Sequence, residues 1–153
     1  MGCCSPDREV AVEVKRLVMG GQTCERCGDA WDAALAAVRA VEGELAGYGV
    51  RVRLIETQLP PERITESNTV LVAGRPAEEW LDGAVLPSDS DCPSCGELVG
   101  EPVCCRSYEV AGEEVEALTP EVIATAIRRA AGIPEPRPIG ALRVTIVTTP
   151  ECG

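Results

Sequence analysis

The sequence predicts an α/β fold built on a mixed central sheet, with a cysteine-rich insertion, and three observations support this class. An alternating apolar segment, a long segment with helical periodicity and a second alternating segment follow one another in residues 10–55. Hairpin patterns come later, around residues 69–81 and 108–117, and a second helical pattern ends at Gly132. A strand–helix–strand unit makes a parallel pair with a right-handed crossover, whereas a hairpin is antiparallel, so the sheet is expected to be mixed.

The first three elements are predicted by hydrophobic periodicity. Valines alternate with more polar residues in residues 10–18, which is typical of a strand with one buried face. Between residues 29 and 46, apolar side chains recur at helical spacing, which indicates an α-helix of about five turns. Gly47 and Gly49 end this helix, and alternation over residues 50–55 predicts a second strand.

The later elements are predicted by turn and capping signals as well as by periodicity. Residues 69–73 predict a third strand, and a glycine–proline turn leads to an expected antiparallel return strand at residues 77–81. A similar hairpin is expected over residues 108–117. Thr119 is a natural N-cap with a proline at the first helical position, so the last helix is expected to run from there to Gly132.

The chain length of 153 residues fits a single domain. We expect residues 1–153 to form one domain with its core in residues 9–132. Residues 82–106 are polar, rich in glycine and proline, and carry four cysteines, so they are expected to form an insertion outside the core. Residues 133–153 form a C-terminal extension, in which alternation over residues 142–146 predicts an extra strand.

Composition excludes several classes of partner. The formal net charge is −11, and no cluster of lysine and arginine offsets it, so neither nucleic acid nor an anionic membrane surface is an expected partner. The sequence has neither an apolar run long enough to span a bilayer nor the pattern of a signal peptide. A cytoplasmic location is therefore expected.

Nine cysteines and no histidine are the most informative feature of the composition. An odd number cannot pair completely within one chain, and a reducing compartment favours catalytic or metal-binding thiols over structural disulfides. Without histidine there is no His-dependent triad, no His-ligated metal site and no imidazolium to activate a thiol. Cys3, Cys4 and Cys152 lie near the termini and are interpreted as accessory or incidental thiols.

Cys24 and Cys27 form a Cys-x-x-Cys pair in the turn that opens the long predicted helix. The N-terminus of a helix carries a partial positive charge and unpaired amide donors, and both stabilise a thiolate. Two intervening residues also allow the sulfur atoms to form a disulfide, so Cys27 can resolve a mixed disulfide formed on Cys24. These residues predict a redox-active pair.

With this pair and this order of elements, residues 9–132 resemble the thioredoxin-like superfamily. The wider pattern resembles an uncharacterised prokaryotic branch with an added cysteine-rich insertion. The resemblance implies a three-layer α/β sandwich in which Cys24 is the attacking thiol and Cys27 the resolving thiol. The family usually has a cis-proline just before the third strand, where this sequence reads Glu66-Ser67-Asn68-Thr69.

The second cysteine cluster consists of Cys92, Cys95, Cys104 and Cys105, and its leading interpretation is a local site for zinc or another thiophilic metal. Adjacent cysteines in an extended chain point opposite ways, so only one of Cys104 and Cys105 is expected to ligate, while the other stays free to relay electrons to Cys24 or Cys27. The segments 24–28 and 92–96 also both match the knuckles of zinc ribbons and rubredoxins. In that alternative, the two pairs complete one Cys4 site.

The favoured functional hypothesis is a thiol–disulfide oxidoreductase or thiol electron carrier, with a protein or small-molecule disulfide as substrate and a separate electron donor. The alternative is a non-catalytic protein that binds zinc or soft metals such as mercury and arsenic. No organic cofactor is expected in either case.

Overall fold

The computed structural model describes residues 8–134, and its central feature is a mixed sheet. The strands are β1 (Arg8–Leu17), β2 (Val50–Leu59), β3 (Thr69–Val72) and the short β4 (Arg75–Pro76), in the order β2-β1-β3-β4. β1 is parallel to β2 and antiparallel to β3, and β3 is antiparallel to β4. The predicted parallel pair and the mixed sheet are confirmed.

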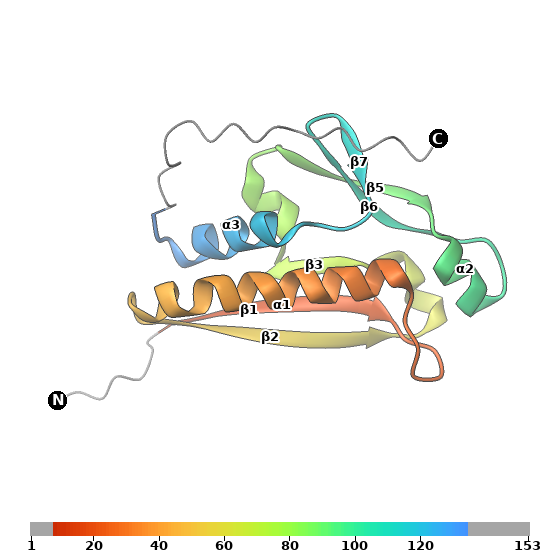
Figure 1. The fold of residues 1–153 in the computed structure, drawn as a ribbon, viewed down its shortest axis with the longest axis horizontal. Helices are drawn as coiled ribbons and strands as arrows, with labels where there is room; N and C mark the ends of the chain where they lie inside the picture. Colours follow the sequence, from red (N-terminus) through yellow and green to blue (C-terminus); the bar gives the residue numbers. More distant parts are fainter. Residues whose placement is uncertain (1–7, 135–153) are drawn as a thin grey trace.

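Two helices, α1 (Glu25–Ala46) and α3 (Pro120–Ala131), lie side by side against the sheet (Figure 1). Arg128 of α3 donates a hydrogen bond to Glu44 of α1 at 2.9 Å. The alternation in β1 directs Val10, Val12 and Val14 into the main core, while α1 contributes mainly alanine and valine. Small side chains let α1 pack closely on the strands, which explains how a core with few aromatic residues is filled.

A second, antiparallel sheet follows the first along the chain. It consists of β5 (Val85–Asp91), β6 (Cys104–Val110) and β7 (Glu113–Val115), and the short helix α2 (Pro93–Val99) connects β5 to β6. Figure 1 shows this sheet beyond β3 and α3, with α2 at the end of the molecule where α1 begins. The predicted hairpin over residues 108–117 and the capped last helix are both present.

The prediction of an antiparallel return strand at residues 77–81 is wrong. After the β4 pairing at Arg75–Pro76, the chain coils into a 3-10 helix, η2 (Ala77–Leu81). This coil buries Ala77 and lets the indole nitrogen of Trp80 donate to the carbonyl of Val72 at 2.9 Å. A straight strand could not direct both Ala77 and Trp80 toward the first sheet. The two residues are three positions apart, and side chains at that spacing in a strand face opposite sides.

The segment predicted as a cysteine-rich insertion forms regular secondary structure. Residues 82–106 contain β5, α2 and the start of β6, and they bury Cys92, Cys95 and Cys105 while their polar side chains remain largely exposed. Cysteine packs as a small apolar residue, so a segment that is polar on average can still contribute to a buried cluster.

The described residues confirm the α/β class, and their arrangement is compatible with a three-layer sandwich. The strand predicted at residues 142–146 lies outside the described residues, as do Cys3, Cys4 and Cys152. Within residues 8–134, no helix combines the length and the apolar composition that crossing a bilayer requires.

Candidate functional site

The structure brings the two cysteine groups together into one buried cluster. Its sulfur atoms come from both Cys-x-x-Cys pairs and from β6, and we call this set the cysteine cluster: Cys24, Cys27, Cys92, Cys95 and Cys105. All five side chains are reduced and buried. The cluster is separate from the main core and is walled by apolar side chains: Leu17, Met19, Ile64, Leu98, Val99 and Val103.

The first pair is positioned by the N-terminus of α1, as predicted. Cys24 is the N-cap residue, with extended backbone angles, and its sulfur accepts a hydrogen bond from the backbone N–H of Cys27 at 3.4 Å. The Thr23 hydroxyl donates to the carbonyl of Leu17 at 2.7 Å and ties this turn to the end of β1. The cap places Cys24 and Cys27 on the same side of the turn.

The second pair is positioned by α2 in a similar way. Cys92 is the N-cap of this helix, and its backbone N–H donates to the carbonyl of Val103 at 3.0 Å. Gly96 follows Cys95, and a Cβ atom at this glycine would lie only 3.2 Å from the carbonyl oxygen of Glu101. The returning backbone therefore leaves little room for a side chain at this position, which favours glycine.

The two pairs contact each other directly, although they are far apart in sequence. The backbone N–H of Glu25 donates to the hydroxyl of Ser94 at 3.2 Å. That hydroxyl lies 3.7 Å from the sulfur of Cys92. Ser94, which the sequence analysis did not single out, thus joins the start of α1 to the second knuckle.

Arg26, between the cysteines of the first pair, is buried, although no sequence pattern indicates that it should be. Only 3% of it is exposed. Its guanidinium donates to the backbone carbonyl oxygens of Ser90, Asp91, Cys105 and Arg106 and to the carboxylate of Glu116, at 3.0–3.4 Å. This side chain anchors the start of α1 to the second sheet and fixes the backbone of Cys105.

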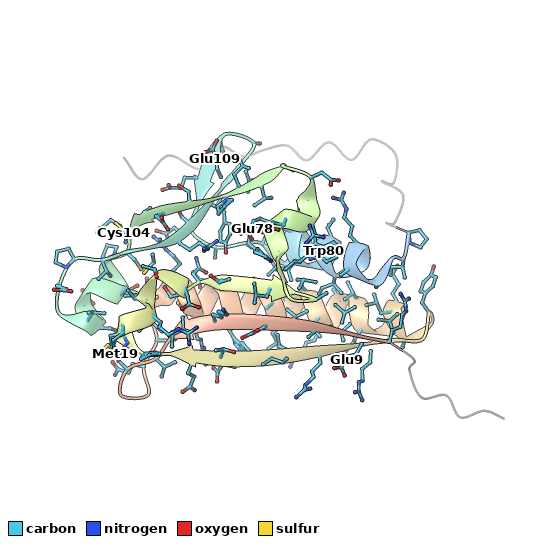
Figure 2. All side chains as sticks on the ribbon, turned by 180° about the vertical axis from the view of Figure 1, so that it is seen from behind. Glu9, Met19, Glu78, Trp80, Cys104 and Glu109 are labelled. Carbon is cyan, nitrogen blue, oxygen red and sulfur yellow. The ribbon has the colours of Figure 1, made fainter. Side chains whose placement is uncertain are left out.

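Cys104 and Cys105 face opposite sides of β6, as expected for neighbours in a strand. Cys105 joins the cysteine cluster, whereas Cys104 is exposed and lies outside it. Figure 2 shows Cys104 and Met19 near the end of the molecule that carries α2. The four residues predicted as one local metal site are therefore divided, and three of them meet the first pair instead.

Three sulfur atoms have the spacing of a metal-ligand set. The Sγ atoms of Cys24, Cys92 and Cys95, here called the triad, all lie within 4.8 Å of one another. A tetrahedral zinc–thiolate site with bonds of about 2.3 Å has sulfur atoms about 3.8 Å apart, so small side-chain movements would bring the triad to bonding distance. Cys27 and Cys105 flank the triad and interact with Cys95.

Burial and hydrogen bonding shift the thiol pKa values of the cluster in opposite directions. The pKa of Cys27 is lowered to about 3, chiefly by hydrogen bonding with Cys24 and then with Cys95. The pKa of Cys105 is lowered to about 6, chiefly by hydrogen bonding with Cys95. The pKa of Cys92 is raised, mainly by burial, and that of Cys95 is raised, first by hydrogen bonding with Cys105. The cluster therefore favours some thiolate even without a bound cation.

Backbone groups also support the Cys27 thiolate, and one of them belongs to Asn68, in the stretch where the resemblance called for a cis-proline. Backbone hydrogen bonding from Leu17 and Asn68 lowers the Cys27 pKa further. Asn68 has a left-handed φ of 60°, and residues 8–134 contain no cis peptide bond. The side-chain amide of Asn68 donates to the backbone carbonyls of Arg106 and Glu116 at 2.7 and 2.6 Å. These bonds hold the backbone of Asn68 in place.

Comparison with other proteins gives a family but no activity. A protein of Archaeoglobus fulgidus, described as an uncharacterized protein, is 28% identical over 119 residues, which are 75% of this chain and 82% of that protein. No solved structure matches the chain. The family model of a domain of unknown function, DUF2703, matches residues 10–127. That span includes the whole cysteine cluster and most of α3, so the chain belongs to the DUF2703 family.

Proposed function

We propose that this protein binds a thiophilic metal or metalloid ion through the cysteine cluster, with zinc, mercury and arsenic as candidate ions. The observation that carries the proposal is the convergence of three buried sulfur atoms within 4.8 Å of one another. Thiolates are the protein ligands that soft and borderline ions prefer, and a site of this kind requires neither histidine nor a carboxylate.

Burial supports ion binding over exchange with a disulfide substrate. Cys24, the expected nucleophile, is 2% exposed, and Cys27 is fully buried. A thiolate must reach the disulfide that it attacks, whereas a metal ligand is stabilised by exclusion from water.

The experiment that tests the proposal combines metal analysis with cysteine mapping. We expect the purified full chain to hold about one ion, and we expect alkylation at the cysteine cluster to stay slow until a chelator is added. The Cys95→Ser variant should lose the ion. The matched control, Cys104→Ser, should keep it, because Cys104 is exposed and outside the cluster. A cluster that reacts equally fast with and without added ions would refute the proposal.

A second candidate function is that of a thiol–disulfide oxidoreductase or electron carrier related to the thioredoxin-like superfamily. It is supported by the position of Cys24 at the N-cap of a 22-residue helix and by the low pKa of Cys27. The order of strand, helix, parallel strand, antiparallel pair and final helix also agrees with the resemblance. This function needs a disulfide substrate and an electron donor, which we expect to be cytoplasmic.

Two variants test this second function. Cys24→Ser should abolish the reduction of a model disulfide, and Cys27→Ser should trap a mixed disulfide on Cys24. If both variants reduce the substrate as fast as the parent protein, the oxidoreductase function is excluded.

A further inference from the structure

Within residues 8–134, the surroundings of the triad offer no free positive charge to balance an anionic complex. Its walls are aliphatic side chains and methionine, and the sequence has no histidine. Among the described residues near the cluster, Arg26 is the buried cation, but its guanidinium is directed to Glu116 and to the carbonyls of the second sheet. A complex that retains net negative charge would therefore be costly to bury here.

The number of available ligand atoms also favours a neutral complex. Among the described residues, the three sulfur atoms of the triad lie within 4.8 Å of one another. No fourth ligand atom from the described part of the chain lies within that distance of all three. A divalent ion held by four thiolates carries two net negative charges and needs a fourth sulfur to move inward. A trivalent centre held by three thiolates is neutral and needs only the triad.

We propose that the triad of Cys24, Cys92 and Cys95 binds a trivalent metalloid supplied as its neutral hydroxide, with arsenous acid as the simplest case. This inference rests on the proposed function and names its ligand class. In the reaction As(OH)3 + 3 RSH → As(SR)3 + 3 H2O, three As–O bonds break and three As–S bonds form. Each thiol proton leaves with a hydroxide as water, and arsenic stays trivalent, so no oxidant or reductant is required.

The proton balance separates this reaction from the binding of a divalent ion. Arsenous acid carries away the thiol protons as water, so the solution receives about none. Zinc displaces protons from the thiols that it ligates, and these protons pass to the buffer. The buried, apolar wall also disfavours the reverse hydrolysis, because it keeps water away from the As–S bonds.

Calorimetric titration of the full chain with arsenite and with Zn²⁺ tests the inference. The chain would carry Cys3→Ser, Cys4→Ser and Cys152→Ser, so that only the described cysteines take part. Titrations in two buffers with different heats of ionisation count the protons released. We expect one arsenite per chain with about zero protons released, and release of at least about two protons with zinc.

Variants identify the ligands. Each of the variants Cys24→Ser, Cys92→Ser and Cys95→Ser should weaken arsenite binding at least about 100-fold. This loss of affinity is larger than the one caused by removing an outer-shell partner of a metal site. Cys27→Ser and Cys105→Ser should weaken arsenite binding only about 10-fold, the smaller loss expected of an outer-shell partner, and Cys104→Ser should have no effect. Circular dichroism checks that each variant folds. The number of protons released is measured on the chain with an intact cysteine cluster, so it tests the inference independently of these variants.

Each outcome has a distinct meaning. If zinc binds and arsenite does not, or if arsenite binding depends on Cys27 or Cys105 as strongly as on the triad, this inference is overturned while the proposed function stands. If neither ion binds or protects the cysteine cluster from alkylation, the proposed function fails as well.

Discussion

The Arg26 side chain occupies a position in the Cys-x-x-Cys pair that is usually exposed at a helix start, yet it is buried against the second sheet. Its ion-pair partner, Glu116, has a side chain that is 65% exposed, so water screens much of that pair. The backbone carbonyls are the more important partners, because a buried carbonyl that loses its donor remains unsatisfied. Arg26 therefore contributes to the site mainly by holding the backbone around Cys105.

The Arg26→Met variant keeps most of the side-chain volume and removes every donor. We expect the free energy of unfolding to fall by about 2–4 kcal/mol, and alkylation of Cys105 to become faster. Arg26→Lys should give a smaller loss, since one ammonium reaches fewer carbonyls than a guanidinium. Denaturant unfolding measures the first effect and peptide mapping the second. The exposed Arg39→Met is the matched control, and an equal loss there would contradict this role for Arg26.

The lowered pKa of Cys105 predicts how stability depends on pH in the ion-free protein. The folded thiol ionises at about pH 6, whereas a free cysteine thiol ionises at about pH 9.0. Between these values the unfolded state binds the extra proton, so Cys105 makes stability rise from pH 6 to pH 9, and its contribution is lost as pH falls through 6. Cys27, with a pKa lowered to about 3, adds a rise over the same range that continues down to about pH 3. The raised pKa values of Cys92 and Cys95 end this gain above pH 9.

Unfolding by denaturant across this pH range, with a chelator present, measures the effect. Cys105→Ser should reduce the slope between pH 6 and pH 9 and leave the part that Cys27 contributes, while Cys104→Ser should leave the slope unchanged. An unchanged slope in Cys105→Ser would show that Cys105 does not cause it.

At the scale of elements, the turn between η1 (Pro61–Glu66) and β3 joins the two sheets. Asn68 lies in this turn, is fully buried, and donates to a carbonyl of β6 and to one that follows β7. Its backbone also accepts from the hydroxyl of Tyr108 at 2.7 Å. These bonds couple the position of β6, and therefore of Cys105, to the first sheet.

Asn68→Ala should lower the free energy of unfolding by about 3 kcal/mol, because two partly buried carbonyl groups lose a donor and alanine is strained at positive φ. Asn68→Gly should recover about 1 kcal/mol of this loss, since glycine tolerates that backbone conformation. Thermal or denaturant unfolding measures both. Equal losses in the two variants would show that backbone strain contributes nothing here.

The elements that local patterns predict well are those whose burial follows from their own periodicity. Alternating valines predict β1, helical spacing predicts α1, and Thr119 with the following proline predicts the start of α3. Residues 77–81 were predicted as a strand because no local signal reveals that Trp80 donates to Val72. Tertiary contacts decide short segments of this kind, since local propensity is weak there.

At the scale of the whole molecule, the sequence predicts the candidate residues, but the favoured interpretation separates a redox pair from a metal site. The joining of the two Cys-x-x-Cys pairs follows from the alternative interpretation as zinc knuckles, and that alternative does not include Cys105. The convergence of these cysteines depends on how β6 and α2 pack beside the start of α1, which is a long-range property. The burial of Arg26 could not be predicted either, because its partners are backbone carbonyls, which every residue carries.

The cysteine cluster also determines how stability is distributed through the molecule. It is separate from the main core, and the buried side chain of α2 is Cys95, with Leu98 and Val99 packed against the same cluster. The helix α2 is only seven residues long, too short to be stable on its own. Its structure therefore depends on the cluster, whereas the C-terminal half of α1 depends on the main core.

An ion bound to the cluster should consequently stabilise one end of the molecule more than the other. Binding to the folded state alone adds about 4 kcal/mol at a free ion concentration about 1,000-fold above Kd. Hydrogen exchange should show that removing the ion speeds exchange in α2 and the adjoining ends of β5 and β6, with little change in the C-terminal half of α1. Cys95→Ser should show the fast pattern with or without the ion. Because α2 packs against the cysteine cluster, a uniform change over all elements would mean that its stability does not depend on that cluster.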